Sequence, residues 1–220
     1  STLDRSSAAS DVYKRQVYEG TYKSAEELIA DGRDGIDGIG APNYVDQNGD
    51  GAINQTDFVA LGSPQPDFYY GFRNTLTYKD FTLDFFFHGS YGNEILNAAY
   101  HLGYFGRDPR SNLLPIVKDR WTTSNQNSDI PRAGSSFGNY QQRSDVSYQD
   151  GSFLRLKNVT LTYDLDIPGM KRASIYLTGN NLLLFTKFTH GDPEQSNYGD
   201  GLAQGVANGG YPYNLSLIHI

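Results

Sequence analysis

The feature that most constrains the fold is a pair of long segments, 67–78 and 81–88, in which apolar and polar residues alternate with a period of two. This period is typical of a β-strand that turns one face to an apolar environment and the other to water. Only Lys79 and Asp80 separate the two segments. A connection this short predicts that the strands pair as a β-hairpin.

A second pair of alternating segments, 153–166 and 173–184, follows a long polar stretch, 89–150. Within that stretch we expect short helices around 93–100 and 112–121. Strands of about ten residues, joined alternately by tight turns and very long loops, are typical of an outer-membrane barrel wall. We therefore expect an all-β fold, part of a large antiparallel transmembrane β-barrel whose long extracellular loops contain short helices. A soluble sandwich or jelly roll also alternates, and it is the alternative fold.

The faces of these strands make the barrel interpretation specific. In a barrel wall, charged residues belong on the lumen side, because a charge on the lipid side is costly. The alternation places Arg73, Asp84 and Asp164 on the polar face and none of the three on the apolar face. One further element is expected outside the strands, a short helix over 24–30 with a capping box formed by Ser24 and Glu27.

Both ends of the chain read as translated sequencing adapter. Residues 6–16 match the in-frame translation of a transposase-type adapter, residues 1–5 fit the primer that would precede it, and residues 215–220 match the reverse complement of the same transposon end. Such segments are set aside before fold reasoning. We expect 1–16 and 215–220 to be adapter artefacts, with a genuine tail that matches by accident as the alternative.

Composition excludes several classes of function. The formal charge is −7 and the basic residues are scattered among acidic ones, so we expect no nucleic-acid partner. The chain has no cysteine, which excludes disulfides, thiolate metal sites and cysteine nucleophiles. No run approaches the ~20 apolar residues of a membrane-spanning helix.

Seven blocks of sequence resemble one known family, the SusC/RagA type of TonB-dependent outer-membrane transporter. The blocks, in chain order, are YVDQNGDG at 44–51, LGSPQPDFYYGF at 61–72, FHGSYGN at 87–93, RWT at 120–122, IPR at 130–132, DGSFLRLKNVTL at 150–161, and GNNL at 179–182 through DPE at 192–194. Their order and spacing together carry the resemblance, which covers nearly all of 17–213. The resemblance implies that 17–214 is the C-terminal portion of such a barrel.

What the family implies about function follows from the resemblance alone. It implies outer-membrane import of large nutrients, glycan oligosaccharides or peptides, driven through TonB, with a SusD-like surface lipoprotein as partner and lipid around the wall. The family's plug, its TonB-contacting segment and its final aromatic-ended strand do not match any part of this sequence. We therefore expect that this portion would not insert into a membrane alone, because an open sheet leaves unpaired backbone groups in lipid. No covalent chemistry is needed, so we expect no enzyme activity.

The loop 46–57 has the spacing of an EF-hand calcium loop, with oxygen donors at positions one, three, five, nine and twelve and glycine at position six. The candidate ligands are Asp46, Asn48, Asp50, Ala52, Asn54 and Asp57. Position twelve is an aspartate instead of the usual glutamate, and no flanking helices are evident. The residues therefore suggest either a structural calcium site or a turn built from Asn, Asp and Gly for their backbone preferences.

The remaining motifs give weaker evidence about function. The sequence Gly134–Gly138 fits the nucleophile-elbow pattern, but it lacks the preceding strand and following helix that the pattern needs, so a polar loop is favoured over a secreted esterase. Three of the four histidines, at positions 88, 101 and 190, show no metal-ligand spacing and are expected to be wall or loop residues. Asp192 and Glu194 could bind sugar or calcium, but two acids in a loop are more often solvated.

Aromatic residues in the long loops could stack on sugar rings, pack against a partner, or anchor the loops themselves. These residues are Tyr91, Tyr100, Tyr104, Phe105 and Trp121. From a different functional class, the alternative to a transporter is a soluble β-rich carbohydrate-binding module with a calcium loop.

Overall fold

The computed structural model describes residues 13–105, 112–133, 144–189, 191–194, 206–207 and 217–219. Its strands are β1 (Tyr13–Arg15), β2 (Tyr18–Thr21), β3 (Pro42–Tyr44), β4 (Val59–Gly62), β5 (Phe68–Tyr78), β6 (Phe81–Tyr91), β7 (Glu94–Asn97), β8 (Tyr148–Asp150), β9 (Phe153–Leu165), β10 (Ala173–Thr186), β11 (Val206–Ala207) and β12 (Leu217–His219). Its helices are α1 (Ala25–Ala30) and α2 (Ala98–Phe105), with short 3₁₀ turns at Gln55–Asp57, Pro115–Asp119 and Asp145–Ser147.

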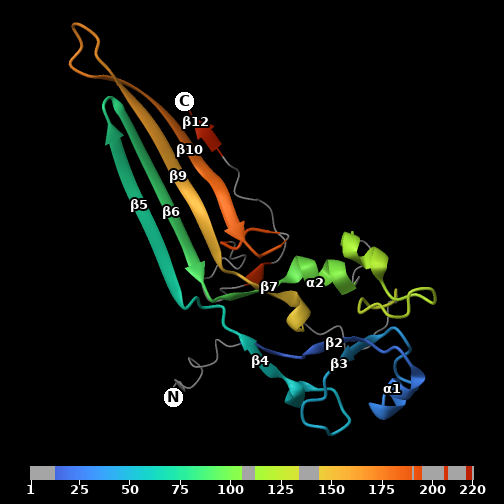
Figure 1. The fold of residues 1–220 in the computed structure, drawn as a ribbon. Helices are drawn as coiled ribbons and strands as arrows, with labels where there is room; N and C mark the ends of the chain where they lie inside the picture. Colours follow the sequence, from blue (N-terminus) through green and yellow to red (C-terminus); the bar gives the residue numbers. More distant parts are fainter. Residues whose placement is uncertain are drawn as a thin grey trace, which may run out of the picture.

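One long antiparallel sheet dominates the structure, with strand order β12-β10-β9-β6-β5. The strands β5, β6, β9 and β10 are 11, 11, 13 and 14 residues long. Figure 1 shows them side by side, extending away from a second region that holds both α-helices and the short strands other than β12, which lies beside β10. The two predicted hairpin pairs are confirmed, and β6 pairs with β9 across the long loop that separates the pairs.

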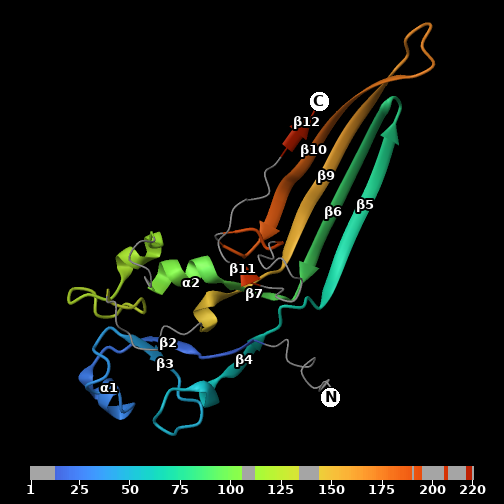
Figure 2. The same cartoon turned by 180° about the vertical axis from the view of Figure 1, so that it is seen from behind.

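The connections within the two hairpins lie at one end of the long sheet, and the long loops gather at the other. Figure 2 shows the same division from behind. Lys79 adopts a φ of 52° in the first tight turn, and Gly169 adopts a φ of 91° in the second connection. Both values lie in the left-handed region, which turns of this kind require. Short turns at one end and long loops at the other match the turn and loop ends expected of an outer-membrane barrel.

Two irregularities interrupt the register of the sheet near its loop end. The pairing of β6 with β9 shifts between Phe86 and Phe87, and the pairing of β10 with β9 shifts between Asn180 and Leu183. Asn181 sits inside the second shift with a φ of 52°. Such bulges bend a strand and re-aim the side chains that follow. Beyond the shift in β9, side chains therefore point to the face opposite to the one that an unbroken alternation would give them. Arg155, which is opposite His88, is one of these residues.

The loop region is built from small sheets and three small apolar clusters. The pairs are β2 with β3, β1 with β4, and β7 with both β8 and β11. Tyr22, Leu28 and Ala41 form one buried cluster, which holds α1 against β2 and β3. Within the described residues, none of the helices has the length and apolar character that a membrane-spanning helix needs.

The structure corrects the predicted helices in the loops. The stretch 93–100 was expected to be helical, but its first part is β7 and the helix α2 begins only at Ala98. Ile95 and Leu96 are buried in this strand. Their packing against neighbouring segments stabilises the strand more than the helix propensity of the sequence stabilises a helix. At 112–121 the structure forms a 3₁₀ turn beginning at Pro115 instead of an α-helix.

The N-terminus of α1 keeps only half of its predicted capping box. Ser24 accepts a hydrogen bond from the Glu27 backbone N–H at 3.3 Å. The Glu27 carboxylate accepts from the backbone N–H of Lys23, one residue earlier than the pattern requires.

Two of the strands lie in the segments that match sequencing adapter: β1 lies in segment 1–16 and β12 lies in segment 215–220. The adapter origin of those segments stays a prediction.

Candidate functional site

The polar face of the long sheet carries rows of hydroxyl and amide groups that run across neighbouring strands. Thr160 and Thr178 are opposite each other with their hydroxyl oxygens 3.0 Å apart, and the Asn158 amide donates to the Asn180 side chain at 3.0 Å. Cross-strand pairs of this kind stabilise a sheet while keeping its surface hydrophilic. Such a surface can form hydrogen bonds with water and with polar solutes.

Charged side chains follow the predicted distribution between the two faces. Arg73 Nε lies 3.1 Å from Asp84 Oδ2, and both side chains project from the face that carries the threonines. Asp164 is opposite Ser174 and two residues from Thr162, which places it on this same polar face. The prediction that these three residues share the polar side is confirmed.

The opposite face is apolar and exposed. Nine of its aliphatic and aromatic residues are between 37% and 58% exposed: Phe72, Leu76, Phe81, Leu161, Tyr163, Ile175, Leu177, Leu183 and Phe185. Among the described residues, no second sheet packs against this face. Soluble monomers rarely expose a continuous apolar surface of this extent. The sandwich alternative needs a second sheet there, and the described part of the chain does not provide one.

A cluster of ionic side chains lies where the polar face meets the loop region. Arg155 on β9 forms a hydrogen-bonded ion pair with Asp192 at 2.6 Å, and both side chains are buried. Arg155 Nε is also 2.7 Å from Glu194. The expectation that both acids are solvated is wrong for Asp192, which is buried, whereas Glu194 stays exposed while it is ion-paired. The bulges in β9 and β10 turn Arg155 toward the segment after β10, a consequence that sequence spacing does not reveal.

The histidines are wall and loop residues. His88 projects from β6 beside this ionic cluster, with Nε2 3.5 Å from Glu194. His101 on α2 is buried and its Nδ1 lies 2.7 Å from the Ser147 hydroxyl. Among the described residues, no group of three or more His, Cys, Asp or Glu side chains is arranged to hold a metal ion. His190 and the pattern Gly134–Gly138 lie outside the described residues.

In the 46–57 loop, the predicted calcium ligands bind the loop's own backbone. Asp46 accepts from the N–H groups of Gly49 and Gly51 at 2.7 and 2.8 Å, and these hydrogen bonds, that of Gly51 first, lower the pKa of its carboxyl. Asn48 and Asp50 each accept from the backbone two residues further on, at 2.9 and 2.8 Å. These are Asx turns, as the turn interpretation requires.

Asp57 at position twelve has a different role from a typical ligand. It is fully buried and accepts from the backbone of Gln47 and Asn48 through one oxygen and from Asn54 through the other. Both oxygens are therefore used to close the loop. Asn54 caps the 3₁₀ turn that holds Asp57, and its amide donates to the Ala52 carbonyl at 2.9 Å. Asn48 and Asp50 stay exposed and Asp46 is partly exposed, and calcium binding there stays a prediction.

The loop aromatics anchor the loop region. Tyr104 and Phe105 are buried in a cluster with Ile130, and Tyr18 packs edge-on against both rings. Burial raises the pKa of Tyr104 to about 12. The anchoring interpretation thus describes these two residues, whereas Tyr91 is exposed at the loop end of β6 and stacks on Phe68 at 5.4 Å.

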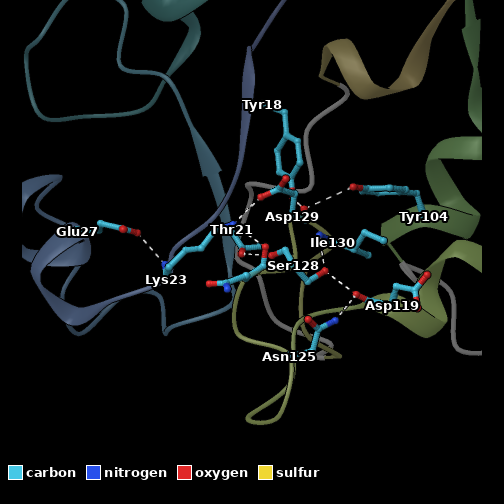
Figure 3. Close-up of polar contacts among 11 residues, drawn as sticks. Tyr18, Thr21, Lys23, Glu27, Tyr104, Asp119, Asn125, Ser128, Asp129 and Ile130 are labelled. Carbon is cyan, nitrogen blue, oxygen red and sulfur yellow. Dashed lines mark hydrogen bonds and ion pairs between the residues drawn. The ribbon is translucent and has the colours of Figure 1, made fainter.

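Polar contacts attach the loop 119–130 to β2. Figure 3 shows Asp129 between Tyr18, Lys23 and Tyr104. The Tyr18 hydroxyl donates to the Asp129 carbonyl, and Lys23 Nζ lies 2.6 Å from the Asp129 carboxylate. The Thr21 hydroxyl donates to the Ser128 carbonyl at 2.7 Å. The loop is therefore held through two of its backbone carbonyls and through one side-chain ion pair.

The same loop is closed internally. The Asp119 carbonyl accepts from the Asn125 amide at 2.9 Å and from the Ser128 hydroxyl at 2.6 Å, as Figure 3 also shows. Trp121 N donates to the Ile130 carbonyl at 2.8 Å. These hydrogen bonds hold the loop in one conformation, so that it can present a defined surface.

A groove of about 580 Å³ opens between α2, the turn after it, and the segment that follows β10. Its lining is formed by Tyr100, Leu114, Pro115, Ile116, Gln149, Asp150, Lys187 and Thr189. Gln149 is fixed there, because its side-chain oxygen accepts from Thr189 N at 3.0 Å. No sequence pattern pointed to this groove, since its walls come from four separate segments.

Comparison with known proteins gives consistent matches along nearly the whole chain. No family model matches. The chain is 43% identical over 210 residues to TonB-dependent receptor P26 of Formosa agariphila, covering 91% of this chain and 21% of that protein. It is 33% identical over 205 residues to TonB-dependent receptor P3 of the same organism, covering 89% of this chain and 20% of that protein. The chain therefore spans about a fifth of the length of the curated relatives it matches.

Solved structures share the fold. A structure of the RagAB peptide transporter matches with a TM-score of 0.72 and 24% identity, over 93% of this chain and 22% of that one. The closed-closed state of the RagAB peptide importer matches with a TM-score of 0.69 and 22% identity, over 93% of this chain and 22% of that one. At this identity the likeness concerns the fold, and it places the long sheet and its loops in the architecture of a barrel wall.

Proposed function

This chain belongs to the TonB-dependent receptors of the outer membrane, and from that premise we propose that its long sheet is a piece of barrel wall through which a large nutrient is imported. The observation that carries the proposal is the division of the sheet into an exposed apolar face and a polar face rich in threonine. Lipid would cover the first face and water and cargo would contact the second, which is how a barrel wall distributes its residues.

The finer parts of the proposal rest on the family. We propose that the receptor is of the SusC/RagA type, that its energy arrives through TonB, and that a SusD-like surface lipoprotein closes over the loop end. Support for the last point is the gathering of ordered loops at one end of the sheet, where Figure 1 places α1, α2 and the short strands other than β12. The cargo is a glycan oligosaccharide or a peptide. A wall of this kind performs no covalent chemistry.

The wall assignment is tested by cysteine labelling, because the chain has no cysteine of its own. Leu161 and Thr162 are adjacent on β9 and project from opposite faces. In outer-membrane vesicles containing the full gene product, we expect a water-soluble maleimide to label the Thr162→Cys variant and to spare the Leu161→Cys variant. Equal labelling of both variants would contradict a membrane wall.

The transport assignment is tested separately. We expect cells that express the full gene product to take up candidate oligosaccharides or peptides, and we expect uptake to stop when TonB is deleted. Deleting the SusD-like lipoprotein should reduce capture of cargo at low concentration while leaving the barrel in the membrane. Uptake that persists at the same rate without TonB would refute active transport and favour passive passage.

A further inference from the structure

At the loop end of the polar face, the wall holds the carboxylate of Glu194 between groups from two neighbouring strands. Glu194 Oε2 is 2.7 Å from Arg155 Nε and 3.7 Å from Lys157 Nζ, both on β9. Its other oxygen is 3.5 Å from His88 Nε2 on β6. The nitrogen-bearing groups thus all belong to the wall, whereas the carboxylate comes from the segment that follows β10.

The two carboxylates of this cluster differ in depth. Asp192 is the inner partner of Arg155, and both side chains are about 95% or more buried, with side-chain exposures of 5% and 3%. Glu194 is the outer partner, with 24% of its side chain exposed next to the 42% of Lys157. The inner pair is sealed from water, whereas the outer carboxylate can be reached from the polar face.

The charges of the wall favour one further carboxylate. Without Glu194, the two cations Arg155 and Lys157 would face the single charge of Asp192, which leaves one positive charge unbalanced beside the half-exposed Lys157. A carboxylate that reaches this position balances that charge and can form charge-assisted hydrogen bonds there. In the present conformation the chain supplies that group itself.

The fit of Glu194 in this position is incomplete. Among the described residues, neither Arg155 Nε nor His88 Nε2 has a hydrogen-bond partner, although Arg155 is only 2% exposed. The short approach of Glu194 to Arg155 is therefore an ion pair without a well-directed hydrogen bond. A carboxylate that is free to orient itself could accept from Arg155 Nε, and such charge-assisted bonds are stronger than neutral ones.

We propose that Arg155, Lys157 and His88 form a carboxylate-binding site on the cargo path, that Glu194 occupies it at rest, and that an acidic group of the cargo replaces Glu194. The proposal rests on the proposed function, because it takes the polar face to line the path. The exchange needs only a side-chain movement. The Glu194 backbone N–H donates to Asp192 Oδ1 at 2.9 Å, and Asp192 stays bound to Arg155.

The site recognises a carboxylate, which two kinds of cargo carry: acidic peptides and oligosaccharides that contain uronic acids. The test measures binding of a fluorescent glutamate tetrapeptide and of a labelled oligogalacturonate to the full gene product in detergent. Their neutral counterparts, a glutamine tetrapeptide and a neutral oligosaccharide, are the controls. Whichever acidic probe responds to the variants below identifies the kind of cargo.

Two opposite variants decide the question. Glu194→Gln removes the competing charge and Glu194→Ala vacates the space, and we expect either one to tighten binding of an acidic probe about tenfold, the scale of one charge-assisted hydrogen bond. Lys157→Gln should weaken the same binding. Neutral probes should respond to none of these variants.

Three outcomes would overturn the inference: unchanged affinity for both acidic probes in the Glu194 variants, a change that neutral probes share, or no binding of either acidic probe to any variant. Uptake of neutral cargo that proceeds normally alongside such a result would leave the proposed transport function standing. Loss of uptake for every cargo would instead count against the transport function itself.

Discussion

Arg73 on β5 and Asp84 on β6 form an ion pair across the first hairpin, with Nε 3.1 Å from Oδ2, and the Thr75 hydroxyl donates to the same carboxylate oxygen at 2.7 Å. The Arg73 side chain remains 71% exposed. The pair therefore adds little stability by itself. Its importance is positional, because it marks the face of the sheet that tolerates charge.

The first prediction concerns a charge placed on the other face. Val159 lies at the middle of β9 on the apolar side, opposite Phe85 and Gly179. Replacing it in Val159→Arg should destabilise the folded wall by about 2–4 kcal/mol, the cost of a basic side chain at the bilayer midplane. Thr162→Arg, on the polar face of the same strand, is the matched control and should change stability far less. Urea unfolding of the full gene product in lipid vesicles measures both, and equal losses would contradict the assignment of the faces.

The second prediction tests how tightly the loop 119–130 packs. A Cβ at Gly40 would lie 2.5 Å from Trp121 Cδ2, and Gly40 also has a φ of 84°. Gly40→Ala should therefore suffer both steric overlap and backbone strain. Gly49 has a φ of 71° and open space around it, so Gly49→Ala suffers the strain alone.

We expect Gly49→Ala to cost about 1 kcal/mol, and Gly40→Ala to cost clearly more. Thermal unfolding of the two variants in detergent gives the comparison. If both variants lose the same stability, the contact between Gly40 and Trp121 is not as close as the structure shows.

The wall could be predicted from sequence and most of the loop region could not, for a physical reason. A strand in a two-faced sheet repeats its environment every second residue. The face to which Phe81 and Leu83 belong can therefore be predicted from their neighbours in the sequence alone. The helix expected at 93–100 failed because burial of Ile95 and Leu96 depends on segments more than fifty residues away, such as Tyr148 on β8.

The ionic cluster shows the same limit at a single residue. Arg155 reaches Asp192 and Glu194 only because two bulges change the register of β9 against its neighbours. Neither bulge contains a glycine that would have indicated its position in the sequence. Sequence could indicate only that two acids lie near each other in a loop. Their partner became visible once the register was known.

The third prediction concerns alkaline pH. Burial, followed by the nearby Tyr100, raises the pKa of Tyr104 to about 12 from a usual value near 10. Between these two values the unfolded chain has released the Tyr104 proton while the folded chain still holds it, so stability falls as pH rises through this interval. Below the lower value the contribution is fully present.

Ultraviolet titration of tyrosine ionisation checks this directly. The wild-type protein should show a late ionisation step that is absent in Tyr104→Phe, and that variant should lose less stability across the same interval. The Tyr18 hydroxyl lies in the same cluster and burial raises its pKa as well, so part of the late step should remain in the variant. A profile that is unchanged by Tyr104→Phe would contradict the burial of this hydroxyl.

The last prediction separates closure of the 46–57 loop from calcium binding. Asp57 is buried and takes three backbone N–H groups, so Asp57→Ala leaves buried donors unsatisfied and should cost about 1–3 kcal/mol for each donor that water cannot reach. This loss needs no metal and should be the same in the presence of a chelator.

Asp50 is exposed and Asp46 is partly exposed, so these two carboxylates are the ones that a cation could reach. Calcium, if bound, should raise the unfolding temperature of the wild type and not that of a variant carrying both Asp46→Asn and Asp50→Asn. Asparagine keeps one accepting oxygen and replaces the other with an amide nitrogen, so Asp46→Asn also loses one of the two turn hydrogen bonds from Gly49 and Gly51. The double variant should therefore be less stable than the wild type in chelator, and the effect of calcium is read as the shift that calcium adds to each protein's own value in chelator. If calcium fails to shift the wild type while Asp57→Ala is unstable in both media, the loop is a turn closed by its own side chains, and the calcium prediction is wrong.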